Sequence, residues 1–164
     1  TDKVFSFSPT VFTQPFRLAP ILMTSITSFN EPDAVTGRVI NINTTSFSYY
    51  MREQEFNAQI HALETVSYIA WEPSVGTFGT LRFEASRTQD TVSHVFVTAS
   101  YIQSFAKAPV LLADMQTTNG PDTANVRWRN KNASSVQVKV DEEISADNEI
   151  DHSKEVVGYM VFGF

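Results

Sequence analysis

Apolar and polar residues alternate one by one in several short stretches, which is the pattern of strands with one buried face. The alternation is clearest over 38–42, 47–51, 95–97 and 136–140. Denser apolar runs at 66–71 and 156–162 predict central strands that are buried more completely. Two stretches with some helical character, 53–63 and 142–149, lack a sustained period of 3.6 residues, so we predict loops with at most one helical turn. The whole pattern predicts an all-β protein.

The second half of the chain repeats the first. Residues 16–20 (FRLAP) match residues 105–109 (FAKAP), and residues 30–33 (NEPD) match residues 119–122 (NGPD), both 89 positions later. The same offset pairs Phe12 with Tyr101, Arg38 with Arg127, Asn41 with Asn130, Asn43 with Asn132, Phe47 with Val136 and Glu53 with Glu142. After a two-residue insertion the offset is 91, and it pairs His61 with His152, Glu64 with Glu155, Val66 with Val157 and Tyr68 with Tyr159. Such self-similarity is typical of a duplicated unit.

We therefore predict two tandem antiparallel β-sandwich units related by internal duplication. The first covers residues 1–74 and the second covers residues 81–164. Residues 75–80 form the linker, and their two glycines provide the bend. The second unit has a lead-in at 81–94 that the first lacks in full, and the chain stops on an apolar run. We therefore expect it to be part of a larger multidomain protein.

The composition of the chain excludes several classes of function. The 164 residues carry a formal net charge of −6, and there is no cysteine. The absence of cysteine excludes a disulfide scaffold, a thiolate zinc site and a cysteine nucleophile. No apolar run approaches the roughly 20 residues that cross a bilayer, so we expect no membrane partner. The net negative charge argues against nucleic acid, because phosphate contacts need clustered cations.

Two histidines are the first candidates for chemistry. His61 and His152 stand at equivalent positions, each three residues before a glutamate. Such a pair can bind a metal or act as an acid–base couple. Each also precedes a predicted buried strand, where a His–Glu hydrogen bond would simply fix the strand entrance, and we favour this structural interpretation. Since no nucleophile elbow, P-loop or zinc-protease motif is present, we expect no enzyme activity.

Acidic side chains crowd residues 141–155, opposed only by Lys154. Hard oxygen ligands at this density could hold Ca²⁺, with Glu142, Glu143 and Asp147 as the candidate ligands. A solvated acidic loop without any ion explains the same residues. We therefore expect that no cofactor is required, while calcium stays an open alternative.

A row of cations gives the sharper prediction. Arg127, Arg129 and Lys131 alternate, so they project from one face of a strand. At the equivalent positions the first half has Arg38 followed by isoleucines, which predicts a face covered by packing there and an open face in the second half. Guanidinium groups can bind sulfate, carboxylate or vicinal hydroxyls. The alternative is that cross-strand acids, Glu142 or Glu143, pair with the row.

Residues near the row complete the candidate ligand site. They are two turn residues of the second half, their counterparts in the first half, and an aromatic ring that could stack on a sugar: Asn119, Asp122, Asp33, Arg38 and Tyr50. Asn43-Thr44-Thr45 and Asn132-Ala133-Ser134 fit the N-glycosylation pattern, but we interpret them as turns because Asn tolerates left-handed backbone angles.

Short motifs resemble the H-type lectin domain. They are the Phe12-x3-Phe16-x3-Pro20 segment, Ser25-Ile26-Thr27, Arg38-Val39, Thr45-Ser46-Phe47 and Tyr68-Ile69-Ala70-Trp71-Glu72. The chain also looks like the tandem noncatalytic carbohydrate-binding modules of marine bacterial polysaccharide-degrading enzymes, whose Asn-Gly-x-Asp turn, Glu-Glu run and His-x-x-Glu-x-Val-Gly-Tyr strand appear at 119–122, 142–143 and 152–159.

The resemblance implies six-stranded antiparallel sandwiches and noncatalytic sugar binding. The strand arginine of the family corresponds to Arg38 and Arg127. Its aromatic–histidine pair would fall near Glu55 and Glu143 and is absent here, so the monosaccharide specificity of H-type lectins does not transfer.

We therefore expect a noncatalytic carbohydrate-binding module. Its partner would be a polysaccharide, such as a sulfated galactan of the agar or porphyran type, and its location would be secreted or cell-surface. The competing hypotheses are an adhesin-like β-sandwich spacer that makes protein–protein contacts, and a small glycan lyase or hydrolase that uses Glu142 or His152.

Overall fold

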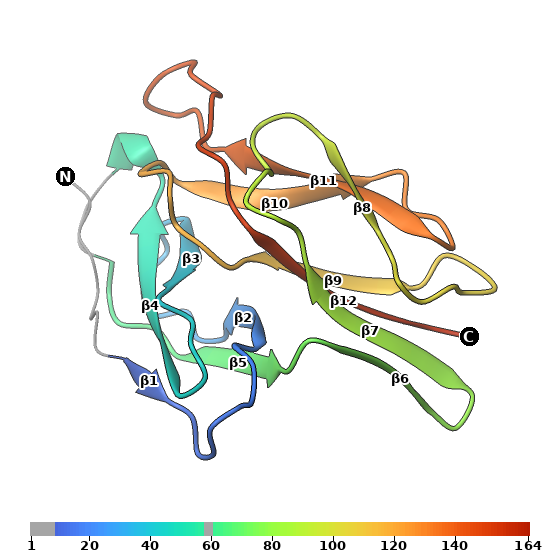
Figure 1. Ribbon diagram of the computed structural model, residues 1–164. Coiled ribbons are helices and arrows are strands. Elements are labelled where there is room, and N and C mark those ends of the chain that lie inside the picture. Colours follow the sequence, from blue (N-terminus) through green and yellow to red (C-terminus); the bar gives the residue numbers. More distant parts are fainter. Residues whose placement is uncertain (1–8, 58–60) are drawn as a thin grey trace.

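The computed structural model confirms that the protein is all-β (Figure 1). It describes residues 9–57 and 61–164. The strands of the first half are β1 (Thr10–Val11), β2 (Ile21–Ile26), β3 (Val35–Ile40), β4 (Ser46–Glu53) and β5 (Val66–Trp71). Those that follow are β6 (Ser74–Phe78), β7 (Leu81–Arg87), β8 (Val97–Ser100), β9 (Val110–Met115), β10 (Ala124–Arg129), β11 (Ser135–Glu142) and β12 (Val157–Gly163).

The strands form antiparallel sheets in each half. In the first half the strand orders are β1-β4-β3 and β2-β5. In the second half they are β10-β11-β8 and β6-β7-β12-β9. Three strands, β2, β3 and β4, have bounds that recur 89 positions later in β9, β10 and β11, and the Val35–Glu53 pairing of β3 with β4 recurs as Ala124–Glu142.

Each half has its own apolar core between its two sheets. In the second half the inward valines of β11 pack on Val157, Tyr159 and Val161 of β12. In the first half Leu22, Val39 and Phe47 form the smaller equivalent. Alternation produced this result, because every second residue of a strand faces the same side.

A third cluster joins the halves. Ile21 and Met23 of β2 pack against Ala85 of β7 and Met160 of β12. Beside it, the side-chain amide of Gln116 accepts a hydrogen bond from Leu22 N at 2.9 Å and donates one to Leu22 O at 2.9 Å. The halves are therefore packed together as well as connected along the chain.

The segment 75–80, predicted to be a linker, belongs instead to the β6–β7 hairpin. Only one of its glycines makes the bend: Gly79 has φ of +60°, whereas Gly76 lies within β6. The hairpin places β6 and β7 in the sheet of the second half, since β7 pairs with β12.

Three other local predictions had different outcomes. The predicted helical turn in the 53–63 loop is confirmed as a short 3₁₀ helix at Glu55–Asn57, although residues 58–60 lie outside the described chain. The strand predicted over 95–97 is wrong for its first two residues, because β8 begins at Val97. The prediction that 66–71 is a more completely buried central strand is wrong for β5, whereas the same prediction for 156–162 is confirmed by β12.

The described residues contain no helix that is long and apolar enough to cross a membrane.

Candidate functional site

Arg127 and Arg129 lie on β10, which is an edge strand of its sheet. The prediction of one row is wrong for Lys131, because it lies beyond the end of β10, after Asn130 with φ of 51°. Arg127 is exposed, with 65% of its side chain accessible, and its Nε lies 3.4 Å from Asp141 Oδ2. The partner predicted from the sequence, Glu142 or Glu143, was therefore wrong, because Asp141 projects on the same side of neighbouring β11. An ion pair this exposed and this long leaves most of the guanidinium free to bind elsewhere.

Two of the three cations contact an aromatic ring, but Trp128 alternates with Arg127 and Arg129 along β10 and projects from the opposite face of the strand. The guanidinium carbon of Arg129 lies 4.0 Å from the centre of the Phe96 ring, and Arg129 Nε donates to Gln137 Oε1 at 2.9 Å. Lys131 Nζ lies 5.0 Å from the centre of the Trp128 ring, which is 50% exposed. Cation–π contacts of this kind contribute roughly 0.5–1 kcal/mol at exposed sites and hold the cations in place over the rings.

Arg38 is not part of an accessible site, which corrects its assignment as a ligand residue. It is 1% exposed, and its Nη2 lies 3.1 Å from Glu155 Oε1. Its Nη1 donates to Asp122 O at 2.9 Å. The prediction that packing covers the row of the first half is confirmed for Arg38, whereas Ile40 and Ile42 are half-buried and line a cleft. Arg38 serves to tie the halves together.

Tyr50 is also a wrong assignment, because it is 4% exposed and cannot stack on a sugar. Asp33 and Asp122 are half-buried turn residues. Asn119 is exposed, and its side-chain amide donates to Lys154 O at 2.8 Å and to Asp90 Oδ1 at 3.2 Å. The predicted ligand residues thus do not converge on one place.

Asn119 lies instead on a cleft of about 770 Å³, which the sequence analysis missed. Polar side chains from the ends of several loops line it, including Asn41, Arg87, Gln89, Asp90 and Asn119. The only sequence signal for this cleft was the turn at 119–122, because its other residues come from segments that meet only in the folded chain.

A second cleft, of about 390 Å³, lies between β2, β3 and β9. Its floor contains Asp114, whose Oδ2 accepts hydrogen bonds from Thr24 N at 3.0 Å and Thr24 Oγ1 at 2.7 Å. Burial raises the pKa of Asp114, against the opposing effect of the Thr24 hydrogen bonds. These bonds between strands of different halves give Asp114 a structural role.

The two histidines lie in equivalent clusters, and the predicted His–Glu hydrogen bond is confirmed in both. His152 Nε2 lies 3.2 Å from Glu155 Oε1, and His61 Nε2 lies 3.3 Å from Glu64 Oε1. Sequence reasoning missed that the other ring nitrogen also meets a carboxylate. His152 Nδ1 lies 2.6 Å from Glu142 Oε1, and His61 Nδ1 lies 3.2 Å from Glu53 Oε1. The signal was present, since Glu53 and Glu142 are equivalent in the repeat.

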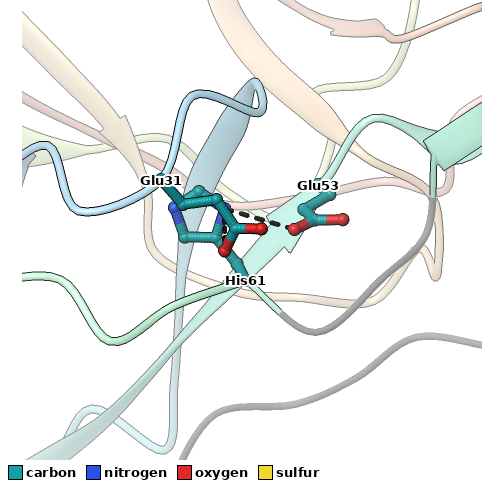
Figure 2. A group of neighbouring side chains, drawn as sticks. All are labelled: Glu31, Glu53 and His61. Carbon is teal, nitrogen blue, oxygen red and sulfur yellow. Dashed lines mark hydrogen bonds and ion pairs between the residues drawn. The ribbon is translucent and has the colours of Figure 1, made fainter.

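The two clusters share this arrangement of one histidine and two glutamates, but the first has an additional carboxylate. In the first half Glu31 turns toward the ring of His61 beside Glu53, with its Oε2 3.8 Å from Nδ1 (Figure 2). Glycine stands at the equivalent position 120, and Gly120 N donates to Glu155 Oε1 at 3.0 Å. Burial lowers the pKa of His152, but its hydrogen bonds with Glu155 and Glu142 outweigh burial and raise that pKa. The two carboxylates thus favour the protonated form of His152.

The three predicted calcium ligands are not brought together by the structure. Glu142 is hydrogen-bonded to His152, Glu143 Oε2 accepts from Glu55 N at 2.8 Å, and Asp147 Oδ1 accepts from Glu149 N at 2.9 Å. Only Glu142 belongs to a group of ligand atoms within 4.8 Å of one another, with Asp122 and Glu149. A second such group within the described chain is Glu31, Glu53 and His61.

Both Asn-x-Thr/Ser segments form turns, as predicted. The predicted left-handed angle lies two residues before each of these asparagines, at Asn41 and Asn130, which have φ of 56° and 51°. The side chain of Asn43 then accepts from Thr45 N at 2.8 Å, as Asn132 accepts from Ser134 N at 2.9 Å. The asparagines are therefore explained by backbone geometry.

Comparison with known proteins gives one similarity. No protein-family model matches the chain, and no solved structure matches it. A stretch of Halomucin from Haloquadratum walsbyi is 28% identical to this chain over 147 residues. That stretch covers 88% of this chain but only 2% of Halomucin, so the chain corresponds to a small part of a much longer protein.

Proposed function

We propose that the protein is a noncatalytic glycan-binding module whose binding surface is the exposed side of β10. The observation that carries the proposal is the exposed pair Arg127 and Arg129 on one face of an edge strand, with Lys131 just beyond the end of that strand. The equivalent Arg38 is buried in an ion pair, so the packing of the fold does not itself require an exposed cation at this strand position.

The chemistry of this surface favours an acidic polysaccharide. Planar guanidinium groups bind sulfate or carboxylate through paired hydrogen bonds. The row is cationic on a chain of net charge −6, so its local charge is opposite to that of the whole protein. We propose a sulfated galactan as the class of ligand.

We also propose that the two halves are two copies of one β-sandwich unit. The matched strand bounds, the shared β3–β4 and β10–β11 registers, and the two His–Glu clusters support this. The similarity to 2% of Halomucin supports a module of a longer protein. We propose that this protein is secreted or lies at the cell surface. A shallow site in such a protein would gain affinity by binding one polymer at several points.

Affinity electrophoresis in gels that contain porphyran, carrageenan, agar or alginate tests the proposal. We expect retardation by the sulfated polymers, and at least a tenfold weaker affinity for an Arg127→Ala/Arg129→Ala double variant. Arg17→Ala is the matched control, because Arg17 is an exposed arginine outside the row. An arm with EDTA tests calcium at the same time.

If none of the four polysaccharides retards the protein, glycan binding is contradicted. It would favour the second candidate, a β-sandwich spacer, which the extensive contacts between the halves also support. Polysaccharide cleavage by this chain, lost in a His152→Gln variant, would favour the third hypothesis.

A further inference from the structure

The outer edge of β5 differs from its counterpart in the second half. β12 pairs with β9 on one side and β7 on the other, whereas β5 pairs only with β2 within the described chain. The shared pairing has the same register, since Ile21–Trp71 corresponds to Val110–Phe162. The free edge of β5 is therefore the edge that β7 covers on β12.

Exposure follows this difference. Tyr68 and Ile69 of β5 are 41% and 49% exposed, whereas the equivalent Tyr159 and Met160 of β12 are 3% and 1% exposed. An exposed strand edge with large apolar side chains is a template for another strand, because its N–H and C=O groups lack ladder partners.

β7 brings a buried carboxylate to β12. Glu84 is fully buried, and its Oε1 accepts a hydrogen bond from the Tyr159 hydroxyl at 3.1 Å. Its Oε2 accepts from Gln103 N at 2.8 Å. Two donors from different segments thus hold one acid at the centre of the added strand.

The first half keeps both donors. Tyr68 is equivalent to Tyr159, and exposed Gln14 is equivalent to Gln103. The loop around Gln14 has the same backbone bonds, because Phe12 N and Phe16 N donate to Thr45 O and Thr44 O as their counterparts donate to Ser134 O and Ala133 O. Among the described residues, no carboxylate bonds to either donor, so both can accept an acid from another segment.

We propose that the outer edge of β5, together with Gln14 and Tyr68, docks an antiparallel strand of the β7 type supplied by another repeat of this unit. The docked strand places its central glutamate between the backbone N–H of Gln14 and the Tyr68 hydroxyl, and it covers Ile69. Main-chain hydrogen bonds give the affinity, and the buried acid sets the register. The partner is thus a β6–β7 hairpin, which would link repeats by strand addition. This inference rests on the equivalence of the two halves and is independent of glycan binding.

A graft tests this. Residue 98 is equivalent to residue 9. In the grafted chain, a second copy of residues 74–97 is therefore joined directly to residue 9. The added β6–β7 hairpin then lies at the same distance along the chain from the first half as the original hairpin lies from the second half. We expect amide hydrogen exchange in β5 to slow at least tenfold in the grafted chain. The matched control is the same graft with Glu84→Ala in the added copy, which should lose most of that protection.

Exchange in β12 serves as the internal measure of folding. Protected β12 amides together with β5 amides that exchange as fast as in the ungrafted chain would overturn the proposal. A Tyr68→Phe variant adds a second arm: it should reduce the protection of β5 in the grafted chain and leave the stability of the ungrafted chain unchanged. Dimerisation of the ungrafted chain through β5–β5 pairing, seen by sedimentation and exchange, would also contradict it, because that pairing brings no acid to Gln14.

Discussion

Arg38 and Glu155 form a fully buried ion pair between the two halves, with Nη2 and Oε1 3.1 Å apart. Arg38 lies on β3, and Glu155 lies just before β12. The carboxylate is satisfied further by Asn119 N at 2.7 Å and by the Thr117 hydroxyl. Removing one partner of a buried ion pair leaves an uncompensated buried charge, which strongly destabilises the fold. The pair therefore couples the position of one half to that of the other.

Replacing Arg38 should destabilise the whole chain. An Arg38→Met variant removes the guanidinium that pairs with buried Glu155, and we expect the free energy of unfolding to fall by about 3–5 kcal/mol in urea denaturation. Arg127→Met at the equivalent exposed position should cost less than about 1 kcal/mol. Similar losses for the two variants would contradict the structural role assigned to Arg38.

The cluster around His152 predicts a stability maximum in mildly acidic solution. Its raised pKa means that the stabilisation by the imidazolium is complete below about pH 6.5 and is lost as pH rises through the folded-state pKa. Burial raises the pKa of Glu155, but hydrogen bonds from His152, Gly120 and Thr117 outweigh burial and lower it. Its contribution is present above about pH 4.5 and is lost as pH falls.

Unfolding free energies measured across pH check this. Above about pH 6.5 we expect the free energy of unfolding to decrease as the pH rises, because the pKa of His152 is raised in the folded state. His152→Gln should remove most of that decrease, whereas His94→Gln, outside the cluster, should keep it. A decrease that survives in His152→Gln would assign the pH dependence to other groups.

Gly158 is predicted to be required for the contact between the halves. A Cβ at this position would lie 2.6 Å from Gln116 Cδ and 2.8 Å from Ile21 Cγ2. Gly158→Ala should therefore displace the Gln116 amide from Leu22 and cost about 2–4 kcal/mol of overpacking and lost hydrogen bonds. Ser67→Ala at the equivalent, exposed position of β5 should be nearly neutral. Thermal unfolding of both variants measures the difference.

The left-handed turns make a further prediction. Asn41 has φ of 56°, which a β-branched residue adopts only with strain. Asn41→Val should cost about 1–3 kcal/mol, while Asn41→Gly should stay within about 0.5 kcal/mol of the parent. Equal denaturation midpoints for the two variants would mean that the turn does not need this backbone angle.

Local pattern predicted the strands well. Alternation and turn residues gave the all-β class and most strand positions, because side chains alternate faces with a period of two and Asn tolerates left-handed angles. The repeat also marked Glu53, His61 and Glu64 and their counterparts as related. These residues meet in one cluster in each half because the end of β4, or of β11, lies beside the segment that precedes β5, or β12. The sequence does not show that these segments are neighbours.

Burial and partnership were decided only by the tertiary structure. Arg38 and Arg127 occupy equivalent strand positions, yet one is buried against Glu155 and the other is exposed near Asp141, because only the first faces the other half. Runs 66–71 and 156–162 are equally apolar, yet only β12 gains a second neighbour in β7. The sequence by itself determined which residues form strands and turns, through backbone preference and alternation. Which strand edges and charges are covered depended on long-range packing, which no local pattern encodes.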